Sequence, residues 1–328
     1  MKHIKIKDVA IYHPEYIVDN EFFHQFYQEK GKDVRHFLEI MGRKERYVIK
    51  DEAENGLTMG IAASKRVLER ANMSGKDIDL IVFSTQVPET TFPTNAMFLH
   101  DAIGADNQTI VMDSNANCAG MTVAVEQASY YMKANPNVNT ALIVGSDYNS
   151  LISNEEEEIT YANYGDAAAA VILEKTDEDT GFIDAIYFTD SVNRNKIMFP
   201  PEGFSKAVRG ASENMLIKWL PFDGSIALPP TYEMIETLLT RNQLTAKDIK
   251  AYCFSQFALG NILKIQEHFQ LEDKQIIYVG DKFGYTGTSS PFIALHEGIA
   301  SGKIQRGDHV LFWTIGAGYQ LVAMLLKY

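Results

Sequence analysis

The sequence predicts an α/β fold made of two related halves, and two features of its pattern support this. Segments with helical spacing alternate with short apolar strands, as at residues 59–72 and 80–84 and again at 118–133 and 141–145. This alternation is typical of sheets covered by helices. The pattern of the first half also returns in the second. We therefore expect an N-terminal half over residues 1–175 and a C-terminal half over residues 176–328.

The repeat has a period of about 170 residues and includes charged positions as well as apolar ones. The recurring pairs are Leu68-Glu69-Arg70 with Leu239-Thr240-Arg241, Lys76-Asp77-Ile78 with Lys247-Asp248-Ile249, and Phe83-Ser84 with Phe254-Ser255. A period this long is not that of a solenoid. Chance similarity between helix-turn-strand units is the alternative, and the shared charges favour a duplication.

Composition and charge argue against several classes of protein. A net charge of −13 opposes broad nucleic-acid binding, which depends on Lys and Arg. No run approaches the ~18 apolar residues of a membrane helix, and the N-terminal segment lacks the apolar core of a signal peptide. We therefore expect a cytoplasmic protein with no membrane contact. The only cysteines, Cys118 and Cys253, form no metal-binding or disulfide pattern, so no metal and no cofactor are expected.

Cys118 is the candidate nucleophile because it lies between a strand and a helix. Residues 111–121 read VMDSNANCAGM, so a strand ends, a polar turn follows and Cys118 opens an apolar helix. Unpaired N–H groups and the helix dipole favour a thiolate there, so we expect a pKa below the usual value of about 8.5. The small Ala119 and Gly120 would let a thioester approach. A buried structural cysteine is the alternative, and it is the interpretation we favour for Cys253.

Residues 190–230 are rich in proline and show little periodicity. We interpret them as an irregular insertion near a substrate entrance, or as a junction between the halves.

Several ordered motifs resemble those of the 3-oxoacyl-ACP synthase III family of the thiolase fold, and the resemblance runs from about residue 4 to residue 328. The motifs are Gly42-Arg43-Lys44-Glu45-Arg46, Asn117-Cys118-Ala119-Gly120, Tyr164-Gly165-Asp166, Gly302-Lys303-Ile304-Gln305-Arg306-Gly307-Asp308 and Gly316-Ala317-Gly318. The resemblance implies a thiolase-like fold in five layers. It also implies a homodimer that takes acyl groups from CoA or acyl carrier protein (ACP) thioesters onto Cys118, in fatty-acid or specialised-metabolite biosynthesis.

The same resemblance implies roles for residues beyond the nucleophile. Phe92 matches an aromatic residue that reaches across the dimer into the partner's acyl pocket; ordinary core packing is the alternative. The backbone N–H groups of Cys118 and of the Gly316-Ala317-Gly318 turn would form an oxyanion hole. Ala317 keeps its N–H, so the donor persists although the family has glycine there.

The chain departs from the family at two catalytic positions. The family completes its site with a histidine and an asparagine, and the resemblance places Ser255 and Tyr285 at these positions. A serine hydroxyl is no base at neutral pH, whereas a tyrosine hydroxyl can donate a hydrogen bond. His268 and His296 lie too far along their helices to substitute, His268 by about 20 Å.

These departures leave several functions open. We favour an acyltransferase in which Cys118 passes its acyl group to an activated carbon, an alcohol or an amine. The alternatives are ordinary decarboxylative condensation with malonyl-ACP, and a non-catalytic partner subunit or carrier-binding protein that keeps the fold. A reaction like that of hydroxymethylglutaryl-CoA synthase also needs a histidine that we do not find.

Overall fold

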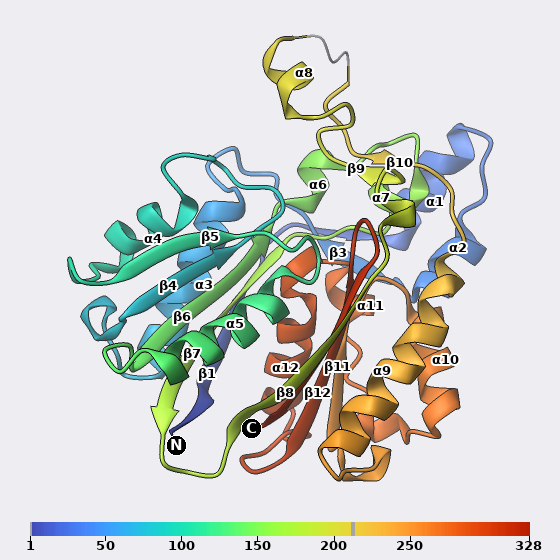
Figure 1. Ribbon diagram of the computed structural model, residues 1–328. Coiled ribbons are helices and arrows are strands. Elements are labelled where there is room, and N and C mark those ends of the chain that lie inside the picture. Colours follow the sequence, from blue (N-terminus) through green and yellow to red (C-terminus); the bar gives the residue numbers. More distant parts are fainter. Residues whose placement is uncertain (1, 211–213) are drawn as a thin grey trace.

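The computed structural model describes residues 2–210 and 214–328, and it contains two large sheets (Figure 1). One sheet has five strands in the order β1-β7-β6-β4-β5, and the other has four in the order β11-β12-β13-β8. The strands of the first are β1 (His3–Tyr12), β4 (Leu80–Ser84), β5 (Ile110–Ser114), β6 (Thr140–Asp147) and β7 (Ala167–Thr176). Those of the second are β8 (Gly181–Thr189), β11 (Ala251–Phe254), β12 (His309–Gly316) and β13 (Gln320–Lys327).

Helices complete five layers, as the sequence predicts. Helices α3 (Gly56–Arg70) and α4 (Asn95–Ile103) cover the outer face of the five-stranded sheet. Helices α5 (Gly120–Ala134) and α12 (Ser290–Ala300) lie between the sheets, and α9 (Leu228–Arg241) and α10 (Leu259–Phe269) cover the four-stranded sheet. This order of layers is a thiolase-like fold.

Smaller elements surround this body. The short strands are β2 (Ile17–Asp19), β3 (Glu45–Tyr47), β9 (Ile197–Met198) and β10 (Lys218–Trp219). The remaining α-helices are α1 (Asn20–Glu29), α2 (Arg35–Met41), α6 (Asn149–Ile152), α7 (Glu158–Tyr161), α8 (Phe204–Val208) and α11 (Gly280–Phe283). The 3₁₀ helices are Gly75–Asp77, Ser191–Asn193, Gly224–Ala227, Ala246–Asp248, Asp273–Gln275 and Gly287–Ser289. No helix in the described ranges is long and apolar enough to span a membrane.

The charged positions of the repeat have the same structural role in both halves. Asp77 accepts hydrogen bonds from the backbone N–H and hydroxyl of Ser74, at 2.7 and 2.8 Å, just before β4. Asp248 accepts the same pair from Thr245, at 2.7 and 2.6 Å, just before β11. The ion pair of Arg70 with Asp8 likewise has a counterpart in that of Arg241 with Asp184. These matched contacts support a duplication. The expected division after residue 175 lies at the end of β7.

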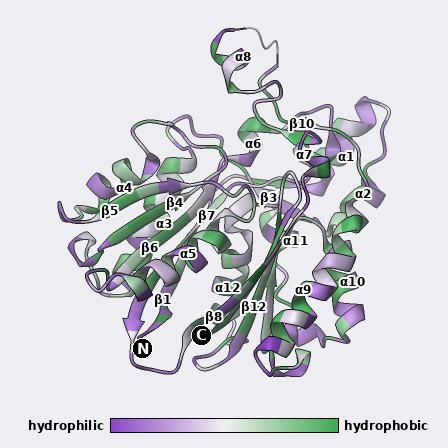
Figure 2. Ribbon diagram, in the orientation of Figure 1, coloured by the Kyte–Doolittle hydropathy of each residue, from purple (hydrophilic) through white to green (hydrophobic). Residues whose placement is uncertain are grey.

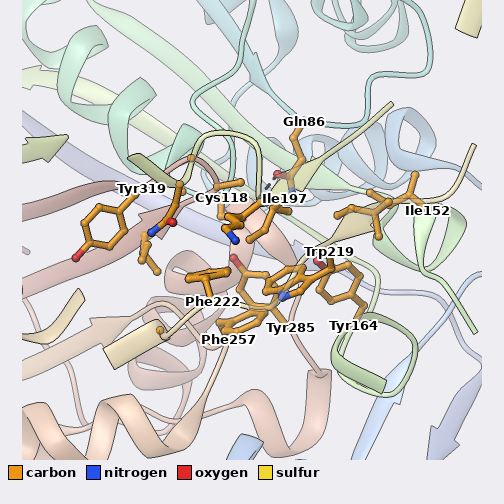
Figure 3. A pocket seen from close by; sticks show the side chains of 18 of the residues that line it. Gln86, Cys118, Ile152, Tyr164, Ile197, Trp219, Phe222, Phe257, Tyr285 and Tyr319 are labelled. Atoms are coloured by element: carbon orange, nitrogen blue, oxygen red, sulfur yellow. Dashed lines mark hydrogen bonds between the residues drawn. The ribbon is translucent and has the colours of Figure 1, made fainter. Parts of the chain in front are cut away.

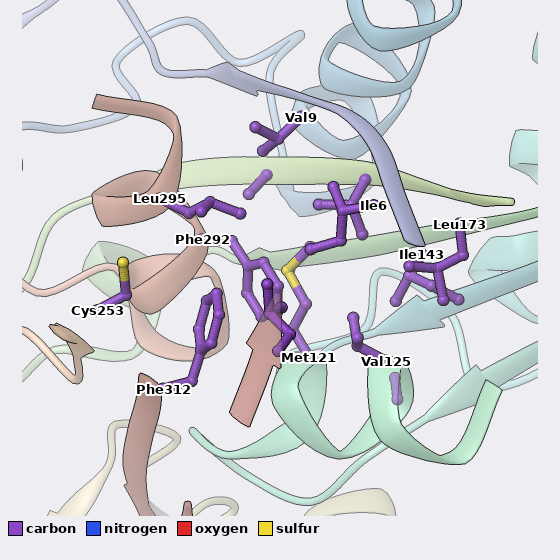
Figure 4. Close-up of a cluster of buried hydrophobic side chains, with 14 of the residues drawn as sticks. Ile6, Val9, Met121, Val125, Ile143, Leu173, Cys253, Phe292, Leu295 and Phe312 are labelled. Carbon is purple, nitrogen blue, oxygen red and sulfur yellow. The ribbon is translucent and has the colours of Figure 1, made fainter. Parts of the chain in front are cut away.

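The largest core lies in the central layer, between the sheets. Figure 4 shows Met121 of α5 and Phe292 of α12 packed between strands of both sheets, and Figure 2 shows hydrophobic residues concentrated along these strands. The rings of Phe292 and Phe312 stack with their centroids 5.0 Å apart. The core therefore fixes α5, whose N-terminus follows Cys118, relative to both sheets.

The insertion over residues 190–230 projects from one end of the body, where α8 is its outermost helix (Figure 1). Its segments on either side of α8 contribute Ile197, Ile217, Trp219 and Phe222 to a deep pocket. The insertion therefore lies at this pocket, which agrees with its interpretation from the sequence as an insertion near a substrate entrance.

Replacing Phe292 by alanine should reduce the free energy of unfolding by about 3–5 kcal/mol, because it leaves a cavity in the central layer. Urea unfolding followed by circular dichroism measures the change. Phe204→Ala is the control, because Phe204 of α8 is 60% exposed and its loss should cost less than about 0.5 kcal/mol. Equal losses in both variants would contradict the layered core.

Candidate active site

Cys118 lies in a tight turn two residues before the first residue of α5, and not in the helix itself. Asn117 precedes it in the left-handed region, with φ of 53°. The first N–H groups of the helix already have partners: that of Gly120 donates to the Asn117 carbonyl at 2.9 Å, and that of Met121 donates to Thr288 Oγ1 at 2.6 Å. The sequence therefore placed Cys118 correctly near the helix start, but these donors are not free to stabilise a thiolate.

The expected lowered pKa of Cys118 is wrong. Burial raises the pKa of this thiol to about 11, while hydrogen bonds with Tyr285, with Gln86 and with the backbone N–H of Ala317 work in the opposite direction. The charge of Asp147 raises the pKa further. Apolar burial disfavours the charged form more than these neutral groups favour it. Cys118 is therefore a protonated thiol at neutral pH.

The thiol lies at the inner end of a pocket, and its side chain is partly exposed. The pocket has an empty volume of about 820 Å³, including space open to solvent. Its walls are mostly aromatic and aliphatic (Figure 3). The lining residues are Gln86, Cys118, Ile152, Tyr164, Asn193, Lys196, Ile197, Ile217, Trp219, Phe222, Gly224, Phe257, Asn261, Tyr285, Ile315, Gly316, Ala317, Gly318 and Tyr319. A thioester can therefore reach the sulfur from outside.

Tyr285 lies beside the thiol, and Ser255 lies near Tyr285. The Tyr285 hydroxyl hydrogen-bonds with Cys118, and burial raises the pKa of this phenol well above its ordinary value. Ser255 is 3% exposed, and its hydroxyl lowers the pKa of the phenol. Within the described residues, no hydrogen-bond partner lies within normal distance of Ser255 Oγ. The structure thus brings Tyr285 to the sulfur, whereas Ser255 is not among the residues that line the pocket.

The turn of Gly316, Ala317 and Gly318 forms the opposite wall, as predicted. The backbone N–H of Ala317 donates toward Cys118, and the Ala317 carbonyl accepts a hydrogen bond from Asn117 Nδ2 at 3.0 Å. This bond connects the turn to the segment that carries Cys118.

Two site residues were missed from the sequence, Gln86 and Asp147. Gln86 Oε1 accepts a hydrogen bond from Cys118 Sγ at 3.7 Å, and its Nε2 donates to Asp147 at 3.2 Å. Burial raises the pKa of Asp147 to about 6, although hydrogen bonds from Thr288, Gln86 and Thr85 lower it. Asp147 could have been identified from the sequence, because it is an acidic residue at the end of the apolar strand 140–147.

One further expectation fails at this site. Ala119 is fully buried and Gly120 packs against β4, where an added Cβ would lie 2.3 Å from Ser84 Oγ. Their small size serves packing and not the approach of a thioester.

The two histidines lie away from the pocket, as expected: His268 stacks on Tyr232 and His296 contacts Glu297. No histidine of the described chain lines the pocket.

Phe92 does not enter the pocket of its own chain. It precedes α4 and is 87% exposed. The alternative of ordinary core packing is therefore wrong for this residue.

Comparison with known proteins gives the same class as the geometry. The family model for 3-oxoacyl-[acyl-carrier-protein] synthase III matches residues 112–191. The model for the C-terminal part of the same family matches residues 239–328. A beta-ketoacyl-[acyl-carrier-protein] synthase III of Rickettsia bellii is 28% identical over 324 residues, covering 99% of each chain. One of Helicobacter pylori strain J99 is 26% identical over 321 residues, covering 96% of this chain and 95% of its own.

Solved structures show the same fold. The 3-oxoacyl-[acyl-carrier-protein] synthase III of Aquifex aeolicus superposes with a TM-score of 0.87 at 23% identity, covering 99% of this chain and 100% of its own. The priming beta-ketosynthase of the R1128 polyketide pathway gives 0.88 at 20% identity, covering 99% and 96%. Fold and site thus define a thiolase-like acyltransferase, which confirms the predicted enzyme class. The chain belongs to the 3-oxoacyl-ACP synthase III family.

Alkylation of Cys118 by iodoacetamide should be slow at pH 7 and should accelerate about tenfold per pH unit up to about pH 10. The reason is that the thiolate fraction grows in this way below a pKa of about 11. Mass spectrometry measures the rate of labelling. The Cys118→Ala variant is the control, because any label that it takes up must be on the buried Cys253. A plateau beginning near pH 8 would contradict the raised pKa.

Proposed function

We propose that this chain takes an acyl group from a CoA or ACP thioester onto Cys118 and transfers it to an acceptor, in fatty-acid or specialised-metabolite biosynthesis. The observation that carries the proposal is the contact between the Cys118 thiol and the Tyr285 hydroxyl in a pocket open to solvent. The names of the relatives support the same class of reaction.

The first step is an exchange of thioesters. Cys118 Sγ attacks the carbonyl carbon of the donor, a new C–S bond forms, and the bond to the carrier sulfur breaks. The thiol proton ends on that sulfur, so the step needs no net base. The Tyr285 hydroxyl is placed to accept the proton while donating its own, which keeps the phenol neutral throughout.

The negative charge on the carbonyl oxygen in this step needs hydrogen-bond donors. The backbone N–H of Ala317, which faces the sulfur, is one such donor in our proposal, and that of Cys118 is the other. Gly316 and Gly318 shape the turn that presents it. Preorganised donors of this kind lower the barrier by a few kcal/mol.

Ser255 and Tyr285 stand in our proposal where the family has its histidine and asparagine. Two neutral hydroxyls provide no base, and only one of them contacts the sulfur. We therefore infer that the second step is acyl transfer to an acceptor that is already nucleophilic, and not efficient decarboxylation of malonyl-ACP. The thioester bond supplies the driving force, so this chemistry uses no cofactor or metal.

Incubation with acetyl-CoA, octanoyl-CoA and the corresponding acyl-ACPs should add an acyl mass to Cys118, detected by intact-protein mass spectrometry. Tyr285→Phe should slow this addition by about 10–100-fold, because the proton relay is lost. Tyr130→Phe, an exposed tyrosine of α5, is the control and should acylate at the normal rate. Cys118→Ala should show no adduct.

Failure of every donor to acylate Cys118 would support the alternative of a non-catalytic partner subunit or carrier-binding protein. Rapid discharge of the adduct by malonyl-ACP with release of carbon dioxide would instead support ordinary condensation.

A homodimer is part of this proposal, and surface features of the N-terminal half support it. β5 is an edge strand, and exposed apolar side chains lie on it and on the neighbouring α4 segment: Phe92 at 87%, Met97 at 48%, Phe98 at 41% and Met112 at 41% exposure. Apolar patches next to an unpaired edge favour association. Phe92 would then enter the acyl pocket of the second copy.

Sedimentation should give twice the 36.8 kDa chain mass for the wild type. Met112→Asp should shift the species toward monomer, because it places a charge in the apolar patch. Leu263→Asp on α10 is the matched control, since Leu263 is 51% exposed on another helix and should leave the mass unchanged. A monomeric wild type would refute the dimer.

A cytoplasmic location is also proposed. Both cysteines are free thiols, as expected in a reducing compartment.

A further inference from the structure

Gln86 presents a fixed carbonyl oxygen to the reacting sulfur. Its side-chain Nε2 donates to Asp147 Oδ2 at 3.2 Å and to Asn149 Oδ1 at 3.5 Å. Its backbone N–H donates to the same carboxylate at 2.9 Å. Because both acceptors require the NH₂ end, the amide cannot be reversed without losing these bonds. Oε1 must therefore face Cys118, as Figure 3 shows.

Acylation of Cys118 removes the S–H proton that donates a hydrogen bond to Gln86 Oε1. The free enzyme has an S–H group at 3.7 Å from that oxygen, whereas a thioester sulfur has none. The oxygen is then an unsatisfied acceptor beside the acyl carbon. An acceptor substrate that carries N–H or O–H can restore the bond, whereas a carbon nucleophile cannot. Gln86 therefore favours heteroatom acceptors, provided that Cys118 is acylated as proposed above.

The polar groups around the sulfur distinguish amines from alcohols. Among the described residues, the side chains that hydrogen-bond with Cys118 are an amide and a phenol whose pKa is raised by burial. Such a phenol can relay a proton but is no strong base, and an alcohol is a poor nucleophile unless a base removes its proton as it attacks. A neutral amine attacks with its own lone pair and loses its proton afterwards.

The residues that line the pocket favour an uncharged amine over a protonated one. No lining residue in the described chain is acidic, and the one charged side chain is Lys196, which repels an ammonium group. Burying an unpaired cation there would be costly. The amine must therefore be weakly basic.

An aromatic row leads from the insertion to the reacting centre. Trp219 lies parallel to Phe257, with ring centroids 5.5 Å apart and an interplanar angle of 6°, and Phe257 meets Tyr285 edge-on at 5.0 Å. Phe222 also stacks on Trp219, with ring centroids 6.2 Å apart. Such surfaces favour planar, apolar ligands. Aromatic amines are both planar and weakly basic.

We propose that the acceptor of the Cys118 acyl group is a neutral aromatic amine whose N–H is bound by Gln86 Oε1. The nitrogen attacks the thioester carbonyl, a C–N bond forms and the C–S bond breaks. The proton that the nitrogen loses passes to Sγ, which restores the S–H group and its bond to Gln86. The products are an amide and the free enzyme, so atoms and electrons balance without another reactant.

The test uses the full-length protein loaded with an octanoyl or acetyl group on Cys118 and freed of donor. Aniline, benzyl alcohol and malonyl-CoA are then added separately at pH 7, and mass spectrometry follows loss of the adduct and formation of product. We expect the anilide to form at least tenfold faster than the ester or the β-keto product. Gln86→Leu should slow anilide formation about tenfold or more while hydrolysis of the adduct changes less.

Controls separate this inference from the function on which it rests. Gln108→Leu, an exposed glutamine outside the pocket, should discharge like the wild type. Cys118→Ala should give no anilide. Normal loading followed by discharge to malonyl-CoA alone, or equal anilide rates in Gln86→Leu and wild type, would overturn the inference and leave the proposed acylation standing. No loading with any donor would overturn both.

Discussion

The arrangement of the site depends on one buried carboxylate, that of Asp147. It ends β6 in the five-stranded sheet and accepts hydrogen bonds from Thr85 Oγ1, the backbone and side chain of Gln86, and the backbone N–H of Thr288. Thr288 in turn accepts from Met121 at the start of α5. A single ionised group therefore ties the end of β4, the start of α5 and the turn after Tyr285. Its four donors offset the cost of burying it.

This network also positions the thiol. Burial keeps the sulfur neutral, and its S–H group donates a hydrogen bond to Gln86 Oε1. In the proposed thioester exchange, the thiol and the leaving carrier sulfur exchange a proton through the neutral Tyr285 hydroxyl, so no histidine is needed. The proposed reaction therefore depends more on the position of the thiol than on its ionisation.

The sequence predicted the parts of the site that depend on local pattern. The strand-turn-helix placement of Cys118 was right to within two residues, and the motif comparison identified Tyr285, which contacts the thiol, although Ser255 does not line the pocket. The pKa of Cys118 was predicted in the wrong direction, because it is set by contacts from remote segments. Trp219 and Phe222, a hundred residues further along the chain, help to enclose the apolar pocket. Gln86 was missed for the same reason, since only its tertiary contacts with Asp147 and the thiol distinguish it from any loop glutamine.

The two halves of the chain contribute different parts of the pocket. Cys118, Gln86 and Asp147 belong to the first half, whereas Tyr285, Ala317 and the aromatic row belong to the second. In the proposed reaction, the groups that exchange a proton therefore come from opposite sides of the boundary between the halves. Because both halves are part of one polypeptide, every chain supplies these groups in equal number.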